Sequence, residues 1–117
     1  MTAKPVLLTA ATDLRTPTTA QLFSGRDHGV DVSFFLNHTR PGAEVSPHRH
    51  PYPEVFVLQD GEATFLVDGE PIAARGGHVV VVPARATHGF RNTGGGTLEM
   101  ISIHPAAEMQ TDWVDRP

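Results

Sequence analysis

The fold is decided by residues 42–61, which read GAEVSPHRHPYPEVFVLQDG. In this stretch His48 and His50 stand two residues apart, and Glu54 follows with the same parity. Residues two apart in an extended chain point to one face, so both imidazoles and the carboxylate can approach one ion. The stretch therefore predicts two successive strands that carry a candidate metal site.

Three short runs separated by Asp-Gly pairs begin inside this stretch and continue beyond it: Glu54–Gln59, Glu62–Val67 and Glu70–Arg75. Asp-Gly between alternating runs is a strong hairpin signal. We therefore predict a three-stranded meander in which Phe56 faces Phe65 and Phe65 faces Ile72.

The rest of the chain also reads as short extended segments. Val30–His38 alternates with a period of two, which predicts a strand with Phe34 and His38 on its apolar face. Further predicted elements are a strand at Val6–Thr9 in an N-terminal arm (1–20), a doubly buried strand at 78–83, strands at 88–92 and 97–104, and a helix at 106–114. Strands at this spacing without intervening helices favour an all-β antiparallel sandwich or small barrel.

Composition limits the possible functions. The chain has 117 residues, enough for a single domain, and a formal net charge of −4, so no basic surface is expected for nucleic acid. It has no cysteine, so a metal must be bound by nitrogen and oxygen. No run is apolar enough for a bilayer span, and residues 1–10 lack a secretory signal, so we expect a cytoplasmic protein that contacts no membrane.

A wider frame surrounds the histidine pair. It runs Gly42-x5-His48-x-His50-x3-Glu54-x6-Gly61, and after fifteen residues Gly77-x5-Pro83-x4-His88-x3-Asn92. These two motifs, with this separation, resemble those of the cupin family. The resemblance covers residues 42–92, nearly half of the chain.

The resemblance implies one domain, 1–117. The implied domain contains a double-stranded β-helix (jelly-roll) barrel of six to eleven strands and a tail at 106–115 with a short C-terminal helix. It implies that His48, His50, Glu54 and His88 bind one divalent metal per chain inside the barrel. It also implies a homodimer, since dimers are common in the family and an extended arm leaves sheet edges for a partner.

Two positions depart from the family pattern. Arg85 stands where the second motif usually has glycine, and His78 where it often has aspartate. Neither position is a metal ligand in the family. Arg85 therefore affects the expected turn geometry, because a non-glycine residue there must avoid a strained positive φ or adopt another turn.

Three imidazoles and one carboxylate suit Fe, Mn, Ni, Co, Cu or Zn and are poor for calcium. Four protein ligands leave two positions open in six-coordinate geometry, which favours a catalytic or ligand-binding site over a closed structural one. Glu54 is also a candidate for moving a proton. Candidate pocket-lining or supporting residues are Phe34, His38, Tyr52, Phe56, Phe65, Ile72, Phe90 and His104.

The resemblance favours a metal-dependent, dioxygenase-like enzyme acting on a small organic molecule. Two alternatives stay open: a non-redox isomerase, decarboxylase or lyase, and a module that binds or senses a small ligand without turnover. No helix-turn-helix segment accompanies the barrel, which disfavours a transcription factor.

Overall fold

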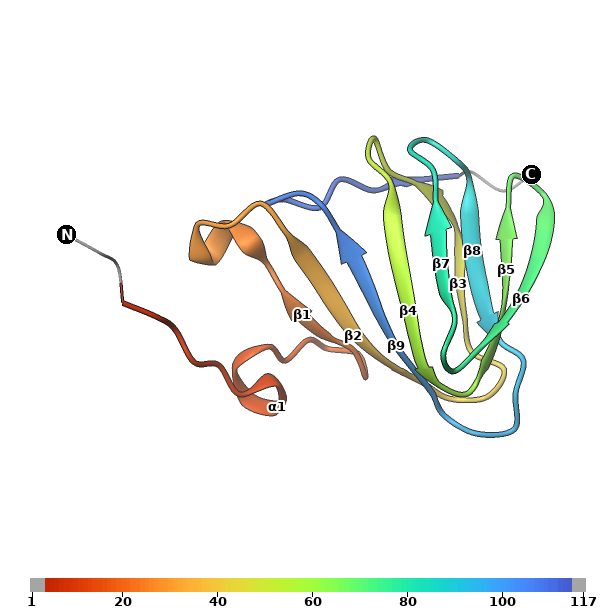
Figure 1. The fold of residues 1–117 in the computed structure, drawn as a ribbon, viewed down its shortest axis with the longest axis horizontal. Helices are drawn as coiled ribbons and strands as arrows, with labels where there is room; N and C mark the ends of the chain where they lie inside the picture. The colour runs from red at the N-terminus through yellow and green to blue at the C-terminus, as the bar shows by residue number, and fades with distance from the viewer. Residues whose placement is uncertain (1–3, 115–117) are drawn as a thin grey trace.

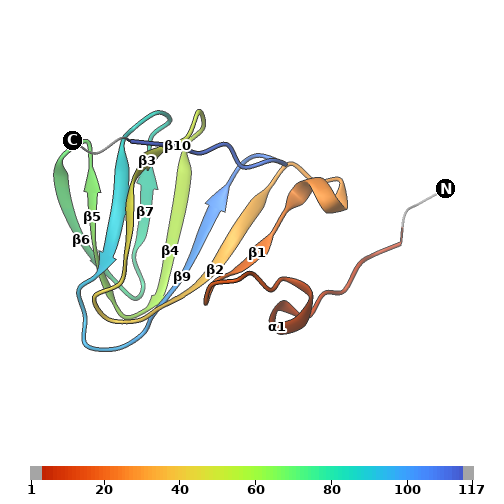
Figure 2. The same cartoon turned by 180° about the vertical axis from the view of Figure 1, so that it is seen from behind.

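Two five-stranded antiparallel sheets pack face to face in the computed structural model, which describes residues 4–114 (Figures 1 and 2). The first sheet has the strand order β1-β2-β9-β4-β7 and the second sheet β10-β3-β8-β5-β6. The strands are β1 (Gln21–Phe23), β2 (Ser33–Thr39), β3 (Glu44–Arg49), β4 (Glu54–Asp60), β5 (Glu62–Val67), β6 (Glu70–Arg75), β7 (Val79–Val82), β8 (His88–Asn92), β9 (Leu98–His104) and β10 (Asp112–Trp113). The all-β jelly-roll class is confirmed.

Helix is confined to two single turns in the described residues, α1 (Ala10–Asp13) and the 3-10 turn η1 (Gly25–His28). Neither has the length or apolar character needed to cross a bilayer.

The core lies between the two sheets. Phe56 from the first sheet meets Phe65 from the second edge to face, with ring centroids 4.9 Å apart, and Phe65 lies 5.6 Å from Phe90. Leu58 and Met100 complete this layer and are almost fully buried. Each large apolar side chain buried in this way contributes about 1.5–3 kcal/mol.

The predicted three-stranded meander is wrong at its first turn. β4 and β5 lie in different sheets: β4 pairs with β7 and β9, whereas β5 pairs with β6 and β8. Gly61 makes the corner with a φ of 92°, where an added Cβ would come within 2.8 Å of the Thr97 carbonyl oxygen. Splitting the two strands lets each sheet bury its inner face against the other. The β5–β6 hairpin forms as predicted, with Phe65 opposite Ile72.

The predicted inner face of β2 is inverted. Phe35 and Asn37 line the interior cavity, while Phe34 stacks on Phe23 at 4.9 Å and His38 pairs with Glu99 on the outer side. Hydrophobic alternation could not choose the side, because the outer face of the first sheet is apolar too. The prediction that the strand at 78–83 is buried on both sides is also wrong. One side of β7 lies on the outer face, where Val79 and Val81 are 58% and 62% exposed.

Both terminal predictions are corrected. Residues 106–114 form bends and the short strand β10, which pairs with β3, instead of a helix. The pairing with the end of β3 is a long-range contact that overrides local helix propensity. Val6–Thr9 forms no strand; this segment extends beyond α1, away from the barrel (Figures 1 and 2).

Candidate metal centre

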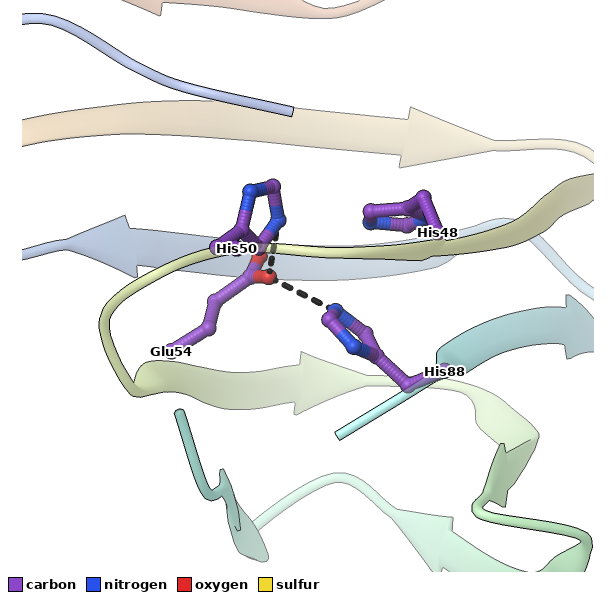
Figure 3. A group of neighbouring side chains, drawn as sticks. All are labelled: His48, His50, Glu54 and His88. Carbon is purple, nitrogen blue, oxygen red and sulfur yellow. Dashed lines mark hydrogen bonds and ion pairs between the residues drawn. The ribbon is translucent and has the colours of Figure 1, made fainter. Parts of the chain in front are cut away.

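The two strand motifs bring four side chains together at one end of the barrel. His48 lies on β3 directly opposite His88 on β8, past an irregularity in register between Val45 and His48. His50 follows β3 immediately, and Glu54 opens β4 in the other sheet. The cluster therefore joins the two sheets (Figure 3).

The geometry of this cluster is compact. One candidate ligand atom from each of His48, His50, Glu54 and His88 lies within 4.8 Å of the others. Glu54 Oε1 lies 2.9 Å from His88 Nε2 and 3.0 Å from His50 Nε2 (Figure 3). Metal–ligand bonds of about 2.1 Å put adjacent octahedral ligands about 3.0 Å apart, so these separations fit one cation.

Backbone carbonyls determine which ring nitrogen faces the centre. The Nδ1 atoms contact carbonyl oxygens at close range: His48 with Ser46 (2.8 Å), His50 with Gln110 (2.8 Å) and His88 with Ala86 (2.9 Å). A carbonyl can only accept, so each neutral ring carries its proton on Nδ1. The Nε2 lone pairs then face inward, as metal ligation requires.

One inward-facing atom lacks a hydrogen bond. His50 Nε2 is buried without a partner of acceptable angle, although Glu54 Oε1 is only 3.0 Å away. The two atoms are close but do not have the geometry of a hydrogen bond. The unprotonated Nε2 of His50 therefore faces the Glu54 carboxylate oxygen directly. Buried polar atoms are rarely left in this state, and a cation between the two would satisfy both. The donor set therefore fits a metal.

The electrostatics keep the carboxylate ionised. Burial alone would raise the pKa of Glu54, but the close imidazoles of His104, His50 and His88 outweigh it and lower this pKa well below its usual range. Burial lowers the pKa of His48, helped by its neighbouring imidazoles. Burial also opposes the protonation of His50, but Glu54 and the Gln110 carbonyl outweigh it and raise the pKa of His50.

A fourth imidazole supports Glu54 from the other side. His104 Nε2 lies 3.2 Å from Glu54 Oε2, and its Nδ1 lies 2.9 Å from the Tyr52 hydroxyl. That hydroxyl accepts the Gln110 N–H at 3.2 Å, so its own proton can be donated to His104. His104 then carries its proton on Nε2 and donates it to Glu54, which leaves Oε1 to face the three other histidines.

The expectation that Arg85 avoids a positive φ is wrong. The φ of Arg85 is 66°, and its N–H donates to the His50 carbonyl at 2.8 Å. The turn therefore keeps the left-handed shape that a glycine would favour, and it fixes the His50 backbone. The Arg85 side chain lines a separate hollow of about 520 Å³ with Arg49 and Asp112.

A cavity of about 560 Å³ opens beside the cluster. Three of the predicted pocket residues, Phe56, Phe90 and His104, line it. Tyr52 stacks on His50 with ring centroids 5.2 Å apart and reaches the site through His104.

Four predicted pocket residues do not line the cavity. Phe34 and His38 point to the outer face of the first sheet, because the face of β2 is inverted. Phe65 is fully buried in the core behind the cavity, and Ile72 is 39% exposed on the edge strand β6.

Several lining residues were missed. Phe35, Asn37 and Ser102 come from the inner faces of β2 and β9, and Trp113 comes from β10. Ser33, Phe35 and Asn37 alternate along β2 and form its inner face. The residues between them are more apolar, so the hydrophobic pattern favours the wrong face. Nothing in the sequence shows that the tail brings Trp113 to the cavity.

Comparison with known proteins agrees with this architecture. The family model described as "Cupin domain" matches residues 35–104. The chain belongs to the cupin family. This match contains both strand motifs and all four side chains of the cluster.

Two curated proteins illustrate the cupin relatives. Protein SchB of Streptomyces halstedii is 42% identical over 82 residues, covering 69% of this chain and 54% of SchB. Dimethylsulfoniopropionate lyase DddW of Ruegeria pomeroyi is 37% identical over 49 residues, covering 42% of this chain and 32% of DddW. The chain thus spans about half or less of the length of these cupin relatives.

Solved structures support the cupin fold. Oxalate decarboxylase OxdC of Bacillus subtilis superposes with a TM-score of 0.73 at 21% identity, covering 81% of this chain and 27% of that one. One study of this enzyme concerns its Mn(II) centres.

Proposed function

We propose that this cupin is a metal-dependent enzyme that acts on a small organic molecule. One divalent transition metal per chain would be held by His48, His50, Glu54 and His88. The observation that carries the proposal is the set of inward Nε2 atoms, fixed by backbone carbonyls around one carboxylate oxygen, beside a cavity of about 560 Å³.

The donor set suits Fe, Mn, Ni, Co, Cu or Zn without choosing among them. When bound, such a metal supplies a Lewis acid that polarises a substrate oxygen or, for redox-active metals, oxygen chemistry. The chain itself supplies the apolar walls that exclude water. Glu54 is the proposed proton carrier, because its Oε2 faces His104 at 3.2 Å.

The metal site is tested by elemental analysis and metal titration of protein purified without a histidine tag. His50→Ala should weaken metal binding by about 10-fold or more while the barrel stays folded, because a ligand is lost and the core is untouched. His38→Ala, an outer-face histidine, is the control and should bind metal normally. Unchanged metal affinity in His50→Ala would contradict the assignment.

For the reaction, we propose dioxygenase-like chemistry as the first candidate. A second candidate is non-redox lyase or decarboxylase chemistry, which the similarity to a protein named as a lyase favours. Incubation of the iron-, manganese- and nickel-loaded protein with catechols, flavonols and diketones, with and without oxygen, separates the two. Product that forms equally without oxygen rules out the first candidate, and tight binding without product supports a non-catalytic module.

We also propose a homodimer formed through the outer face of the first sheet. Two apolar rows cross this face, and we call them together the outer apolar face: Phe23, Phe34, Leu36, Val55, Val57, Val79, Val81, Ile101 and Ile103. No described residue covers Val79 and Val81, and the arm beside this sheet exposes Val6 and Leu7 at 66% and 96%. Contiguous exposed apolar surface of this kind marks an interface.

The chain exposes more surface than a compact monomer, through its extended arm and the outer apolar face together. The accessible surface is 7547 Å², whereas a compact monomer of this mass exposes about 6,200 Å². The excess exceeds the roughly 800 Å² that each partner buries in a standard interface.

A further inference from the structure

The lining of the cavity is apolar around its metal-binding end. It consists of Thr18, Ala20, Leu22, Phe35, Asn37, Val45, His48, His50, Glu54, Phe56, Phe90, Ser102, His104, Met109, Thr111 and Trp113. A volume of about 560 Å³ falls in the range of small-molecule sites.

Charge in this cavity is restricted to the metal-binding cluster. Among the described lining residues, Glu54 alone carries a formal charge when the histidines are neutral, and no lysine or arginine contributes. Arg49 and Arg85 line the neighbouring hollow, which shares His50 and Thr111 with this cavity, and neither arginine is part of the cavity lining. A divalent cation with Glu54 would leave one net positive charge, which one anionic group of a ligand can balance. A second carboxylate would be desolvated without a cationic partner.

The shape of one wall suits a flat apolar group. Ser102 on β9 is paired with Phe35 on one side and with Phe56 on the other, so a small side chain stands between two phenyl rings in one cross-strand row. Across the cavity, the second sheet carries Trp113, the only tryptophan of the chain. Its ring lies against that of His48 in the same sheet, with ring centroids 4.9 Å apart. Aromatic rings pack well against such surfaces.

The same wall offers one donor and one acceptor. The Asn37 amide nitrogen donates to the Met100 carbonyl at 3.1 Å and to Ser102 Oγ at 3.2 Å. Both amide protons are then used, and within residues 4–114 Asn37 Oδ1 accepts no hydrogen bond. Ser102 Oγ accepts from Asn37, which leaves its own proton free to donate.

We infer that this cavity binds an aromatic molecule that is uncharged away from the histidine cluster and carries a hydroxyl or carbonyl group opposite it, and that it rejects small dicarboxylates. Asn37 and Ser102 are the residues that set this specificity. The inference rests on the proposed function, because it takes the histidine cluster as the reactive end of the site.

Isothermal titration calorimetry with 2-naphthol and with malonate tests this on the zinc-loaded and the metal-free full-length chain. We expect 2-naphthol to bind the zinc-loaded protein at least about 10-fold more tightly than malonate. Ser102→Leu fills the gap between the phenyl rings and should weaken 2-naphthol binding by about 10-fold while zinc affinity stays unchanged. His38→Ala should bind both probes as the wild type does.

A second variant adds a positive charge to the cavity lining. Phe35→Arg supplies the missing cation, so malonate should bind more tightly and 2-naphthol more weakly than in the wild type. Malonate binding as tight as 2-naphthol binding in the wild type, or 2-naphthol binding that neither variant changes, would overturn the inference. Zinc titration alone tests the metal site, so 2-naphthol binding to a protein that takes no zinc would refute the proposed function and support this ligand class.

Discussion

At the residue scale, the most informative atoms are backbone carbonyls that the motif does not mention. The oxygens of Ser46, Gln110 and Ala86 fix three imidazole tautomers, while Tyr52 and the Gln110 N–H fix a fourth on His104. Three rings thereby present lone pairs to the centre and the fourth presents a proton to Glu54. Residues of one type thus take two roles because their hydrogen-bond partners differ.

His104→Ala tests the supporting role of this fourth ring. Without its N–H, Glu54 Oε2 loses a partner and the carboxylate is free to rotate, so metal affinity should fall by about 10-fold with the fold retained. Competition with a chromophoric chelator measures this affinity, and circular dichroism checks the fold. His104→Gln, which can still donate, should recover part of the loss; equal affinity in wild type and His104→Ala would contradict the role.

Metal affinity should fall as the pH is lowered. Bound imidazoles must be neutral, and because the pKa of His50 is raised above 6.5, His50 is the first to compete for a proton as the pH falls toward that value. His48, whose pKa is lowered, follows at more acidic pH. Chelator competition between about pH 8 and 5 should show that metal affinity falls roughly 10-fold per pH unit once His50 takes up a proton. The fall should become steeper when His48 is protonated as well. A flat profile would argue against histidine ligation.

As the pH is lowered, metal affinity should fall before the protein loses the stability that ionised Glu54 contributes. Its folded-state pKa is lowered, so that contribution is present above its unfolded pKa of about 4.3 and disappears only as the pH falls through the folded value. Thermal unfolding of the metal-free protein should therefore change little through Glu54 down to about pH 5. Early acid unfolding that a Glu54→Gln variant does not show would contradict this order.

At the element scale, the contact between β3 and β8 positions two of the four candidate ligands. Gly89, next to His88, approaches β3 so closely that a Cβ would lie 2.5 Å from the Val45 carbonyl oxygen. This approach coincides with the irregular register between Val45 and His48. This chain therefore needs glycine at position 89 for packing, independently of metal chemistry.

Gly89→Ala should destabilise the fold by about 1–3 kcal/mol, because the added methyl forces β8 away from β3. It should also weaken metal binding, since His88 moves with β8. Gly95→Ala is the matched control, with no atom within 4 Å of its added methyl. Urea unfolding curves measure both variants, and equal midpoints would contradict the packing argument.

At the scale of the whole molecule, the two faces of the first sheet have different surroundings. Its inner face provides half of the core and one wall of the cavity, while on the outer apolar face Val79 and Val81 are 58% and 62% exposed. A radius of gyration of 14.8 Å exceeds the roughly 13.4 Å of a compact chain of this length, in keeping with the arm that extends away from the barrel (Figure 1).

Val81→Lys should convert the proposed dimer into a folded monomer, because a charge would be buried in the interface. Val81 is already 62% exposed within one chain, so the barrel itself should keep its stability. Sedimentation velocity measures the change, with Leu66→Lys on the second sheet as the control. A wild-type protein that sediments as a monomer would contradict the proposal.

Alternation and Asp-Gly turns predict the all-β class and the β5–β6 hairpin, because they are local quantities. The convergence of His48, His50, Glu54 and His88 is predicted by the resemblance of their motifs to those of the cupin family. Only the tertiary structure decided that β4 and β5 belong to opposite sheets, that Phe35 and not Phe34 faces the cavity, and that the tail forms a strand bringing Trp113 to the site. The physical reason is that each of these depends on which surface becomes covered, and a sheet with two apolar faces gives no local sign of its inner side.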